Sequence, residues 1–499
     1  MKTRSLILTA ATCAVLLLAG APVWGAKGGV PGKPPKDEEP PPVPMDYPFY
    51  FWKLGHMDGP HDSSKALGIS RDGKVAVGST VVVDFNRAWR MDIDWMLGTD
   101  DALPPLYNEL QVQEDIGVVA PSQFSAAYAA SDMQCDSYNY DISDKENRII
   151  DWCGSLPVGT LDIGQVSYGI EWLLPPLLAD EGTEFLNGVD YWTIPDFGGG
   201  LGDMAVNDVS ADGTILVGTG HTMTGPVGFR ADTAVLDEDG VPIPVKLTIT
   251  DMFYTEQTLQ SSSAQAVSAD GMIIAGFGGT KTGNKAFVTT YLGIDPETDE
   301  ALLESYVLPA IAGGKWSEAY AMTVTDDGVI YIAGRSDSPK GPQASIWFWG
   351  TNPETGEEGY VVKALGGLSK RKYDSMATGI VHRPGAPDGE LLVVGYSQSI
   401  LYPSEAFVWA GNPVLEPDGT DGEFIGYLYD LEYVLIKTGA GEASAMGSSW
   451  ILNQATGIAL NEDLTARIVG WGINPEGGVE AWLAGEYPYG ELEPLLVKE

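Results

Sequence analysis

The chain has 499 residues, of which 28 are Lys or Arg and 69 are Asp or Glu, so its formal net charge at pH 7 is −41. This charge argues against nucleic acid and anionic membrane surfaces as partners, because both would repel the protein. Glycine is abundant at 62 residues, and there are 14 tryptophans and 22 tyrosines. Such a composition favours many short strands joined by tight turns over long surface helices.

The first 25 residues have the features of a secretory signal peptide. Lys2 and Arg4 form a short basic region, and an apolar stretch follows from Leu6 to Ala19. This stretch is shorter than the roughly 20 residues that a membrane-spanning helix needs. Residues 23–25 fit a cleavage site after Gly25. We therefore predict that the mature protein is secreted or periplasmic and soluble, with no membrane insertion.

Residues 26–46 are expected to form a linker without regular structure. Glycines and prolines punctuate this stretch, which ends soon after the run Pro40-Pro41-Pro42, and it has few apolar side chains to bury. Such segments stay extended or disordered because they cannot form a packed core. The remainder, 47–499, is expected to form one folded domain.

One phrase recurs along that remainder. It starts with Ala, passes through a short apolar stretch to a turn that is usually Asp-Gly, and ends with an apolar run closed by Gly. An aromatic residue follows 11 or 12 residues after this closing glycine in most copies. The clear copies are Ala66–Gly78, Ala205–Gly218, Ala266–Gly276, Ala321–Gly334, Ala377–Gly395 and Ala455–Gly470.

A seventh, degenerate copy is expected within residues 100–190. Arg148–Gly154 fits the phrase poorly but lies in the right order. With Gly154 included, the closing glycines are spaced almost regularly, at positions 78, 154, 218, 276, 334, 395 and 470. A period of this kind indicates a repeat architecture in which each copy is one supersecondary unit.

The phrase predicts short strands. Asp-Gly between two apolar runs is the signal of a two-residue β-hairpin. The run after it, such as Ile215–Val217, does not alternate with polar residues, which indicates burial on both faces. An aromatic strand and an outer strand such as Val361–Gly366 complete four strands, the content of one propeller blade. We predict an all-β chain that forms a single β-propeller, with seven blades of four antiparallel strands; six or eight blades are the alternatives.

The two ends of the domain predict how the ring closes. Phe49–Gly55 has the character of an outer strand but precedes the first repeat. The last repeat stops near its aromatic strand at Ala481–Leu483, with little chain after it. We therefore predict that the N-terminal strand completes the last blade.

At these residues the chain resembles the extracellular repeat family named HAF, after its His-Ala-Phe tripeptide. The family pattern joins a small residue, an apolar-Val-Gly run and Ala-Phe-x-Trp, and the His is absent from the copies in this chain. The resemblance covers about residues 49–485 and implies a secreted bacterial propeller, with no catalytic or binding residue carried over. The matching segments are Ala88-Trp89, Ala286-Phe287, Ala406-Phe-Val-Trp409 and Ala481-Trp482.

Two cysteines, Cys135 and Cys153, remain after signal-peptide cleavage. In an oxidising compartment they are candidates for a disulfide, which would stabilise the fold by about 3 kcal/mol in the chain-entropy model. Their spacing matches no metal-binding motif.

The sequence predicts no catalytic residue, cofactor site or metal site. It has no Gly-x-Ser-x-Gly nucleophile motif. His56 and His61, with two aspartates, are interpreted as a solvated loop. Gly200–Ala205 imitates a dinucleotide fingerprint but leads into a β-hairpin, where a phosphate would have no helix N-terminus. Ca²⁺ is the alternative, because acidic turns can supply oxygen ligands; these turns are Asp141–Asp144, Asp237–Gly240, Asp295–Glu300 and Asp418–Asp421.

Two functions remain open. The first is a secreted, non-enzymatic binding or interaction scaffold for an unknown protein or carbohydrate. The alternative is an extracytoplasmic enzyme that acts on polysaccharide through acidic residues at the propeller axis. Propellers host both. Two or three acids with Arg or His in one central pocket would favour the enzyme, whereas a flat aromatic rim or a water-filled channel would favour binding. The degenerate second unit, with its long insertions, is a candidate for a specific surface.

Overall fold

The computed structural model divides into two compact units, residues 1–42 and 43–499. Everything described below lies in the second unit, so the predicted signal peptide and linker lie outside the described residues. The described ranges are 49–55, 63–82, 85–93, 114–115, 124–132, 134–140, 148–154, 157–163, 166–173, 190–194, 204–236, 242–247, 250–251, 257–258, 261–295, 301–352, 356–369, 373–384, 390–412, 425–438 and 450–486.

Four antiparallel strands in consecutive order form the basic unit of the fold. Four such sheets follow one another in the middle of the chain. They are β12 (Ala205–Val209), β13 (Ile215–Thr222), β14 (Gly225–Leu236) and β15 (Pro242–Lys246); β18 (Ser261–Val267), β19 (Ile273–Thr280), β20 (Gly283–Ile294) and β21 (Ala301–Val307); β22 (Ser317–Val324), β23 (Ile330–Ser336), β24 (Gln343–Thr351) and β25 (Glu358–Gly366); and β26 (Ser375–Arg383), β27 (Glu390–Ser397), β28 (Glu405–Asn412) and β29 (Ile425–Asp430).

The two ends of the domain share one further sheet. Strands β30 (Ile451–Leu460), β31 (Ala466–Ile473) and β32 (Val479–Glu486) are completed by β1 (Phe49–Gly55). Strand β1 pairs antiparallel with β32, with Phe49 opposite Glu486. The N-terminal strand therefore lies where the sequence predicted it, at the outer edge of the last repeat.

An eight-stranded sheet contains the first repeat and the degenerate region. One half holds β2 (Ser63–Ile69), β3 (Val75–Val82), β4 (Phe85–Asp92) and β5 (Glu114–Asp115), and the other holds β6 (Phe124–Ala130), β9 (Pro157–Ile163), β10 (Val166–Leu173) and β11 (Asp190–Ile194). A single parallel pair, Asn86 with Phe124, joins β4 to β6. Among the described residues the hydrogen-bonded multi-stranded sheets therefore number six, whereas the sequence predicted seven separate units, because this bridge fuses two of them.

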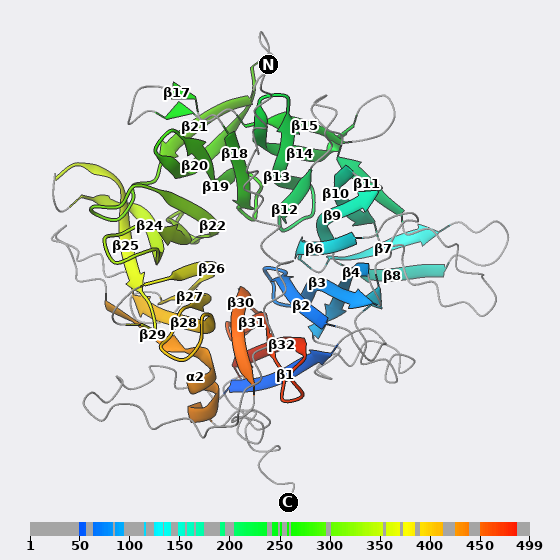
Figure 1. Ribbon diagram of the computed structural model, residues 1–499. Helices are drawn as coiled ribbons and strands as arrows, with labels where there is room; N and C mark the ends of the chain where they lie inside the picture. The colour runs from blue at the N-terminus through cyan, green and yellow to red at the C-terminus, as the bar shows by residue number, and fades with distance from the viewer. Residues whose placement is uncertain are drawn as a thin grey trace, which may run out of the picture. The chain divides into compact units, whose positions relative to one another are not determined.

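The sheets form a β-propeller. Their first strands contact one another in the cyclic order β2, β6, β12, β18, β22, β26, β30 and back to β2. Figure 1 shows these strands around the centre of the second unit, with the later strands of each sheet farther out. A short helix, α2 (Leu431–Thr438), follows β29 and packs on β28 and β1. No helix in the described ranges is long and apolar enough to cross a bilayer.

The closing glycine of the degenerate copy was assigned wrongly. Gly154 ends β8 (Arg148–Gly154), which pairs only with β7 (Gln134–Tyr140) in a two-stranded sheet of its own. The glycine that takes the closing position in this copy is Gly159 of β9, which pairs with Ala127 of the first strand, β6. The hairpin β7–β8 is inserted between β6 and β9, and its apolar run imitates the repeat. A second small sheet pairs β16 (Thr250–Asp251) with β17 (Gln257–Thr258).

A β-bulge marks the same place in every first strand. Its register shift falls at or next to the residue opposite the closing glycine. Even β6 of the degenerate region carries this shift, between Ala127 and Ala129. The others lie at Ala66/Gly68, Val206/Asp208, Ala264/Ala266, Ala319/Ala321, Ala377/Gly379 and Ala455/Gly457.

The closing glycines are required by space. A Cβ at Gly276 would lie 2.0 Å from the Ser263 carbonyl oxygen and 3.0 Å from the Phe287 ring. Phe287 is the cross-strand partner of Gly276, so the ring covers the place that the glycine leaves empty. Gly78 with Trp89 and Gly470 with Trp482 repeat this arrangement. The spacing between glycine and aromatic residue in the sequence is thus a cross-strand pair.

The Asp-Gly turns are longer than the predicted two-residue hairpins. In the copy at Ser210, strands β12 and β13 are joined through five residues, 210–214, of which only Gly213 has positive φ, at 77°. The Ser210 hydroxyl donates to Asp212 Oδ1 at 2.6 Å and accepts from Ile215 N at 2.9 Å. The side chains of Ser210 and Asp212 therefore form hydrogen bonds within this turn, whereas a two-residue turn is closed by backbone hydrogen bonds alone.

Apolar cores lie between neighbouring sheets. One cluster joins Ile215 and Val217 of β13 to Ile274 and Phe287 of the next sheet. As predicted, the runs after the turns are buried on both faces; Leu391–Val394 is at most 1% exposed. Buried serines add hydrogen bonds between sheets, each accepting a backbone N–H from the third strand of the preceding sheet: Ser64 from Ala481, Ser262 from Gly228, Ser317 from Ala286 and Ser375 from Ala344.

The variant Gly276→Ala tests this architecture. Because its Cβ overlaps the Ser263 carbonyl, we expect it to lower the free energy of unfolding by about 3 kcal/mol, as measured by chemical denaturation. Gly359→Ala is the matched control, since nothing lies within 4 Å of a Cβ there. Equal stability of the two variants would contradict the close approach of β18 and β19.

Candidate functional site at the propeller axis

Three turns near the axis share the pattern Ser-x-Asp-Gly, and one of them carries a cation. The turns after β12 and β18 read Ser-Ala-Asp-Gly, whereas the turn after β2 has Arg71 in place of the alanine. These turns end first strands, which surround the centre of the ring, so the Arg71 side chain starts close to the axis.

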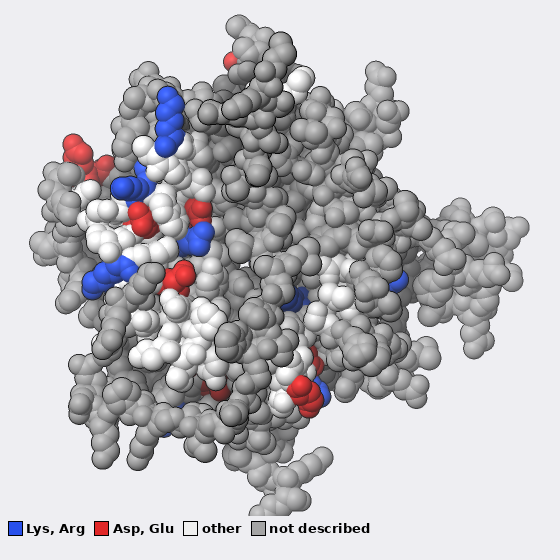
Figure 2. All heavy atoms as spheres, viewed as in Figure 1, with Lys and Arg blue, Asp and Glu red and all other residues white. Residues whose placement is uncertain are grey.

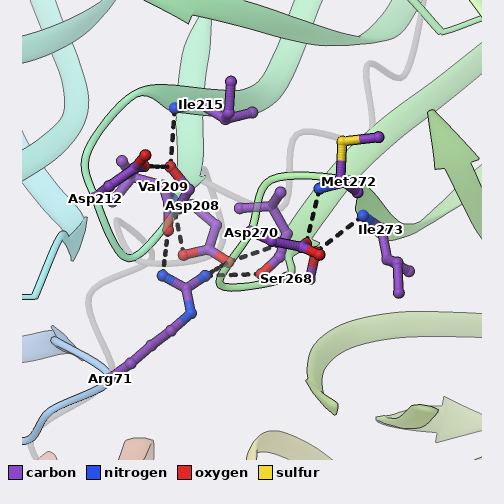
Figure 3. A network of polar contacts seen from close by, with 11 residues as sticks. Arg71, Asp208, Val209, Asp212, Ile215, Ser268, Asp270, Met272 and Ile273 are labelled. Carbon is purple, nitrogen blue, oxygen red and sulfur yellow. Dashed lines mark hydrogen bonds and ion pairs between the residues drawn. The ribbon is translucent and has the colours of Figure 1, made fainter. Parts of the chain in front are cut away.

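Arg71 reaches two other sheets (Figure 3). Its Nη1 donates to the carbonyl oxygen of Val209, and its Nη2 donates to the carbonyl oxygen of Val267 at 2.7 Å. Nη2 also forms an ion pair with Asp208 Oδ2 at 3.1 Å. One side chain from the first repeat thus binds the ends of β12 and β18.

Asp208 is held by donors from both of these strands. Its Oδ2 accepts from Val267 N at 2.8 Å, and its Oδ1 accepts from Val209 N at 2.9 Å. Burial raises the pKa of Asp208, while Arg71 and the two backbone N–H groups lower it, and the balance is a raised pKa. The carboxyl group is therefore bound on both oxygens within the protein.

A chain of hydrogen bonds joins four successive turns beside Arg71. Asp72 N donates to Asp132 Oδ1 at 2.9 Å, Asp132 N donates to the Ala211 oxygen at 3.0 Å, and Ala211 N donates to the Ala269 oxygen at 3.0 Å. Burial, followed by the charge of Asp72, raises the pKa of Asp132. These contacts draw the turn ends of β2, β6, β12 and β18 together around the axis.

A second polar group lies at the opposite end of the first strands. Buried Glu318 accepts from Arg335 Nε at 2.8 Å, from the Tyr320 hydroxyl at 2.7 Å and from Asn284 Nδ2 at 2.6 Å. Arg335 also lies over the Trp316 ring, 5.1 Å from its centroid. Residues from β20, β22 and β23 therefore form one charged and aromatic cluster.

Lys65 of β2 lies in a different setting. Its Nζ is 4.5 Å from the centroid of the Trp471 ring on β31. Within the described part of the chain it has no carboxylate partner, and burial lowers its pKa. It is a half-buried cation held by an aromatic face.

Three carboxyl groups gather where β28 and β29 meet α2. Asp430 precedes the helix, and its Oδ1 accepts from Glu432 N at 3.0 Å. Burial raises the pKa of Glu405 to about 7, of Asp430 to about 6 and of Glu432 to about 8. The neighbouring carboxylates add to the rise at Glu405 and Glu432 because like charges disfavour ionisation.

Among the described residues of the viewed face, charged side chains of both signs lie close together. Figure 2 shows Lys and Arg interspersed with Asp and Glu over the sheets of β18–β25. Charge on this part of the surface therefore favours solubility, and it indicates no single partner.

The residues singled out in the sequence lie largely elsewhere. The register places Cys135 directly opposite Cys153 on β7 and β8, and the disulfide itself stays a prediction. His56 and His61 lie outside the described residues, as do all the acidic turns except Asp295. Within the described ranges no three His, Cys, Asp or Glu side chains converge on a possible metal position.

Arg71, Asp208 and Lys65 were missed because their partners are far away in the sequence. Arg71 and Asp208 are separated by 137 residues, and no spacing rule joins them. A comparison of the repeats with one another could have identified these residues. Aligning the repeats would have shown arginine where two other copies have alanine, and a charged residue breaking an otherwise small or apolar strand.

Comparison with known proteins adds little. No family model matches the chain, and no curated protein matches it. Among solved structures, the chain is similar to a crystal structure of a protein of unknown function from Dyadobacter fermentans DSM 18053, at 11% identity and a TM-score of 0.34. That match covers 88% of this chain and 98% of the other.

The first test of the site removes the Arg71 contacts. Arg71→Met leaves Asp208 without its cation and two carbonyl groups without a donor, so we expect a loss of about 2–3 kcal/mol in the free energy of unfolding. Adding Asp208→Asn should cost less than the sum of the single changes, because the two residues interact. The control is Lys74→Met, whose partner Glu462 is largely exposed; it should lose nothing measurable. Strict additivity would contradict the ion pair.

The carboxyl cluster predicts a pH dependence. Because the folded state raises these pKa values, it binds more protons than the unfolded chain between about pH 4 and pH 8, and stability falls as pH rises through that range. Glu432→Gln should therefore match the parent near pH 4 and be more stable at pH 9. Because solvent screens this partly exposed group, we expect a gain of about 1–2 kcal/mol.

Thermal unfolding of parent and variant across pH 4–9 measures this difference. Glu476→Gln, in an exposed turn, is the control and should leave the pH profile unchanged. A Glu432→Gln profile parallel to that of the parent would show that the cluster does not titrate as proposed.

Proposed function

We propose that this protein is a secreted, seven-bladed propeller that acts as a non-enzymatic binding scaffold. Counting the two halves of the eight-stranded sheet as separate blades supports the number seven, since their first strands, β2 and β6, occupy successive places in the ring. The pairing of β1 with β32 supports closure of the ring by the N-terminal strand. The resemblance to the HAF repeats and the signal-peptide pattern support secretion.

The state of Asp208 carries the proposal. A general acid or base must reach a substrate atom with an oxygen that is not already committed. Both Asp208 oxygens accept hydrogen bonds from the protein's own backbone, and one also pairs with Arg71. The arrangement supports a role for Asp208 in holding blades together, and it leaves ligand recognition to the other end of the first strands.

The alternative is an enzyme that acts on polysaccharide through these axial acids. The observation in its favour is that Asp208 and Asp132, both with raised pKa, lie at the turn ends of successive first strands, with Arg71 paired to Asp208. Perturbed carboxyl groups of this kind are common in active sites. Cleavage would need a pair of carboxyl groups placed on opposite sides of a glycosidic bond.

Binding and turnover can be measured together. The mature protein would be screened against immobilised glycans and extracellular proteins, and soluble polysaccharides would be assayed for new reducing ends. We expect binding to at least one member of the panel and no reducing ends above the buffer control. Turnover that disappears in Asp208→Asn, while that variant still folds, would establish the enzyme instead.

A further inference from the structure

We compared the residue types at equivalent cross-strand pairs of the repeats. Some pairs keep the same small residues in nearly every repeat, and others differ from repeat to repeat. At the closing glycine, the first strand supplies alanine in every copy but one, which has Val206, and the second strand supplies glycine, because the backbones approach too closely there for a side chain on the second strand. The next cross-strand pair toward the start of the first strand has no such restriction. We call it the variable row; its pairs are Lys65/Ser79, Ala126/Thr160, Ala205/Thr219, Ser263/Phe277, Glu318/Arg335, Met376/Tyr396 and Gln454/Trp471.

The variable row differs around the ring. It is small and polar at Ala205/Thr219 and charged at Glu318/Arg335. Most of its side chains are partly exposed. Side chains that the core does not dictate, at the inner edge of the blades, are where a propeller can carry specificity.

Lys65 is the member of the row whose charge no described residue balances. The cation Arg335 is paired with Glu318 at 2.8 Å. Lys65 has only the Trp471 ring, within the described residues, although the chain carries 69 acidic residues. Partial burial of an ammonium group costs free energy that an aromatic face offsets only in part. An anionic group from outside would complete its surroundings.

The neighbours of Lys65 indicate what carries that anion. Trp471 offers an indole surface that stacks on flat or weakly polar rings. Gln454 is the direct cross-strand partner of Trp471, so both side chains leave the same face of the sheet. An ammonium, an indole and an amide at one blade junction match a ring that bears hydroxyls and a carboxylate.

We propose that Lys65, Trp471 and Gln454, at the junction of the first and last repeats, bind a carboxylate-bearing sugar of an acidic polysaccharide. Lys65 pairs with the carboxylate, Trp471 packs on the sugar ring and Gln454 bonds its hydroxyls. This inference rests on the proposed role as a binding scaffold and specifies its ligand class.

The experiment compares two oligosaccharides that differ mainly in charge. Isothermal titration calorimetry would measure binding of trigalacturonate and of neutral galactotriose to the mature protein. We expect trigalacturonate to bind at least tenfold more tightly than galactotriose at physiological ionic strength, where repulsion from the distant acidic residues is screened beyond about 8 Å. Lys65→Met should weaken that binding more than tenfold with an unchanged thermal midpoint, whereas Lys74→Met, a paired lysine at the opposite end of the blades, should leave it within twofold.

Each contrary result has one meaning. If trigalacturonate does not bind, or binds Lys65→Met as tightly as the parent, the acidic-sugar site is overturned. If the protein then binds another glycan or a protein from the screening panel, the scaffold role stands without this site. If it binds nothing in the panel, both proposals fall.

Discussion

The fold depends on the close approach of the first two strands of each blade at the closing glycine. A carbonyl oxygen lies only 2.0 Å from where a Cβ would sit at Gly218, Gly276 and Gly334. The bulge in the first strand falls at or next to the same level, so the strand bends where it is pressed against its partner. An aromatic ring opposite most of these glycines fills the space that the missing side chain leaves. The glycine and its aromatic partner therefore recur in the sequence because the first two strands of each blade approach closely at this one position.

This constraint explains which parts of the structure could be read from the sequence. Glycine and its aromatic partner recur with a period, so the all-β class, the antiparallel units and the position of β1 were predictable. The hairpin β7–β8 was not, since Arg148–Gly154 has the same apolar pattern as a blade strand and only pairing distinguishes them. The turn length was missed because the serine in Ser-x-Asp-Gly replaces a backbone bond, which no dipeptide rule includes. The contacts of Arg71 arise from ring closure, which brings distant repeats together.

The two ends of the first strands serve different needs. At the turn end, Arg71, Asp208 and Asp132 connect successive turns through charged and backbone hydrogen bonds. A ring of weakly similar blades has no single core, since its apolar clusters lie between neighbouring sheets. Bonds across the axis link blades that are not sequence neighbours. At the other end, Lys65 is only partly buried, and the charge of buried Glu318 is balanced by Arg335.

The pairing of β1 with β32 has a consequence for how the chain is made. Phe49, Tyr50 and Phe51 are almost fully buried in the finished protein, yet their partner strand is the last described strand to leave the ribosome. Until then β1 is an apolar edge strand with no neighbour, and such edges pair with whatever chain is near. A nascent copy must therefore be kept apart from other copies for almost its entire synthesis. A stop before Val479 removes β32 and leaves the first strand without its pairing partner.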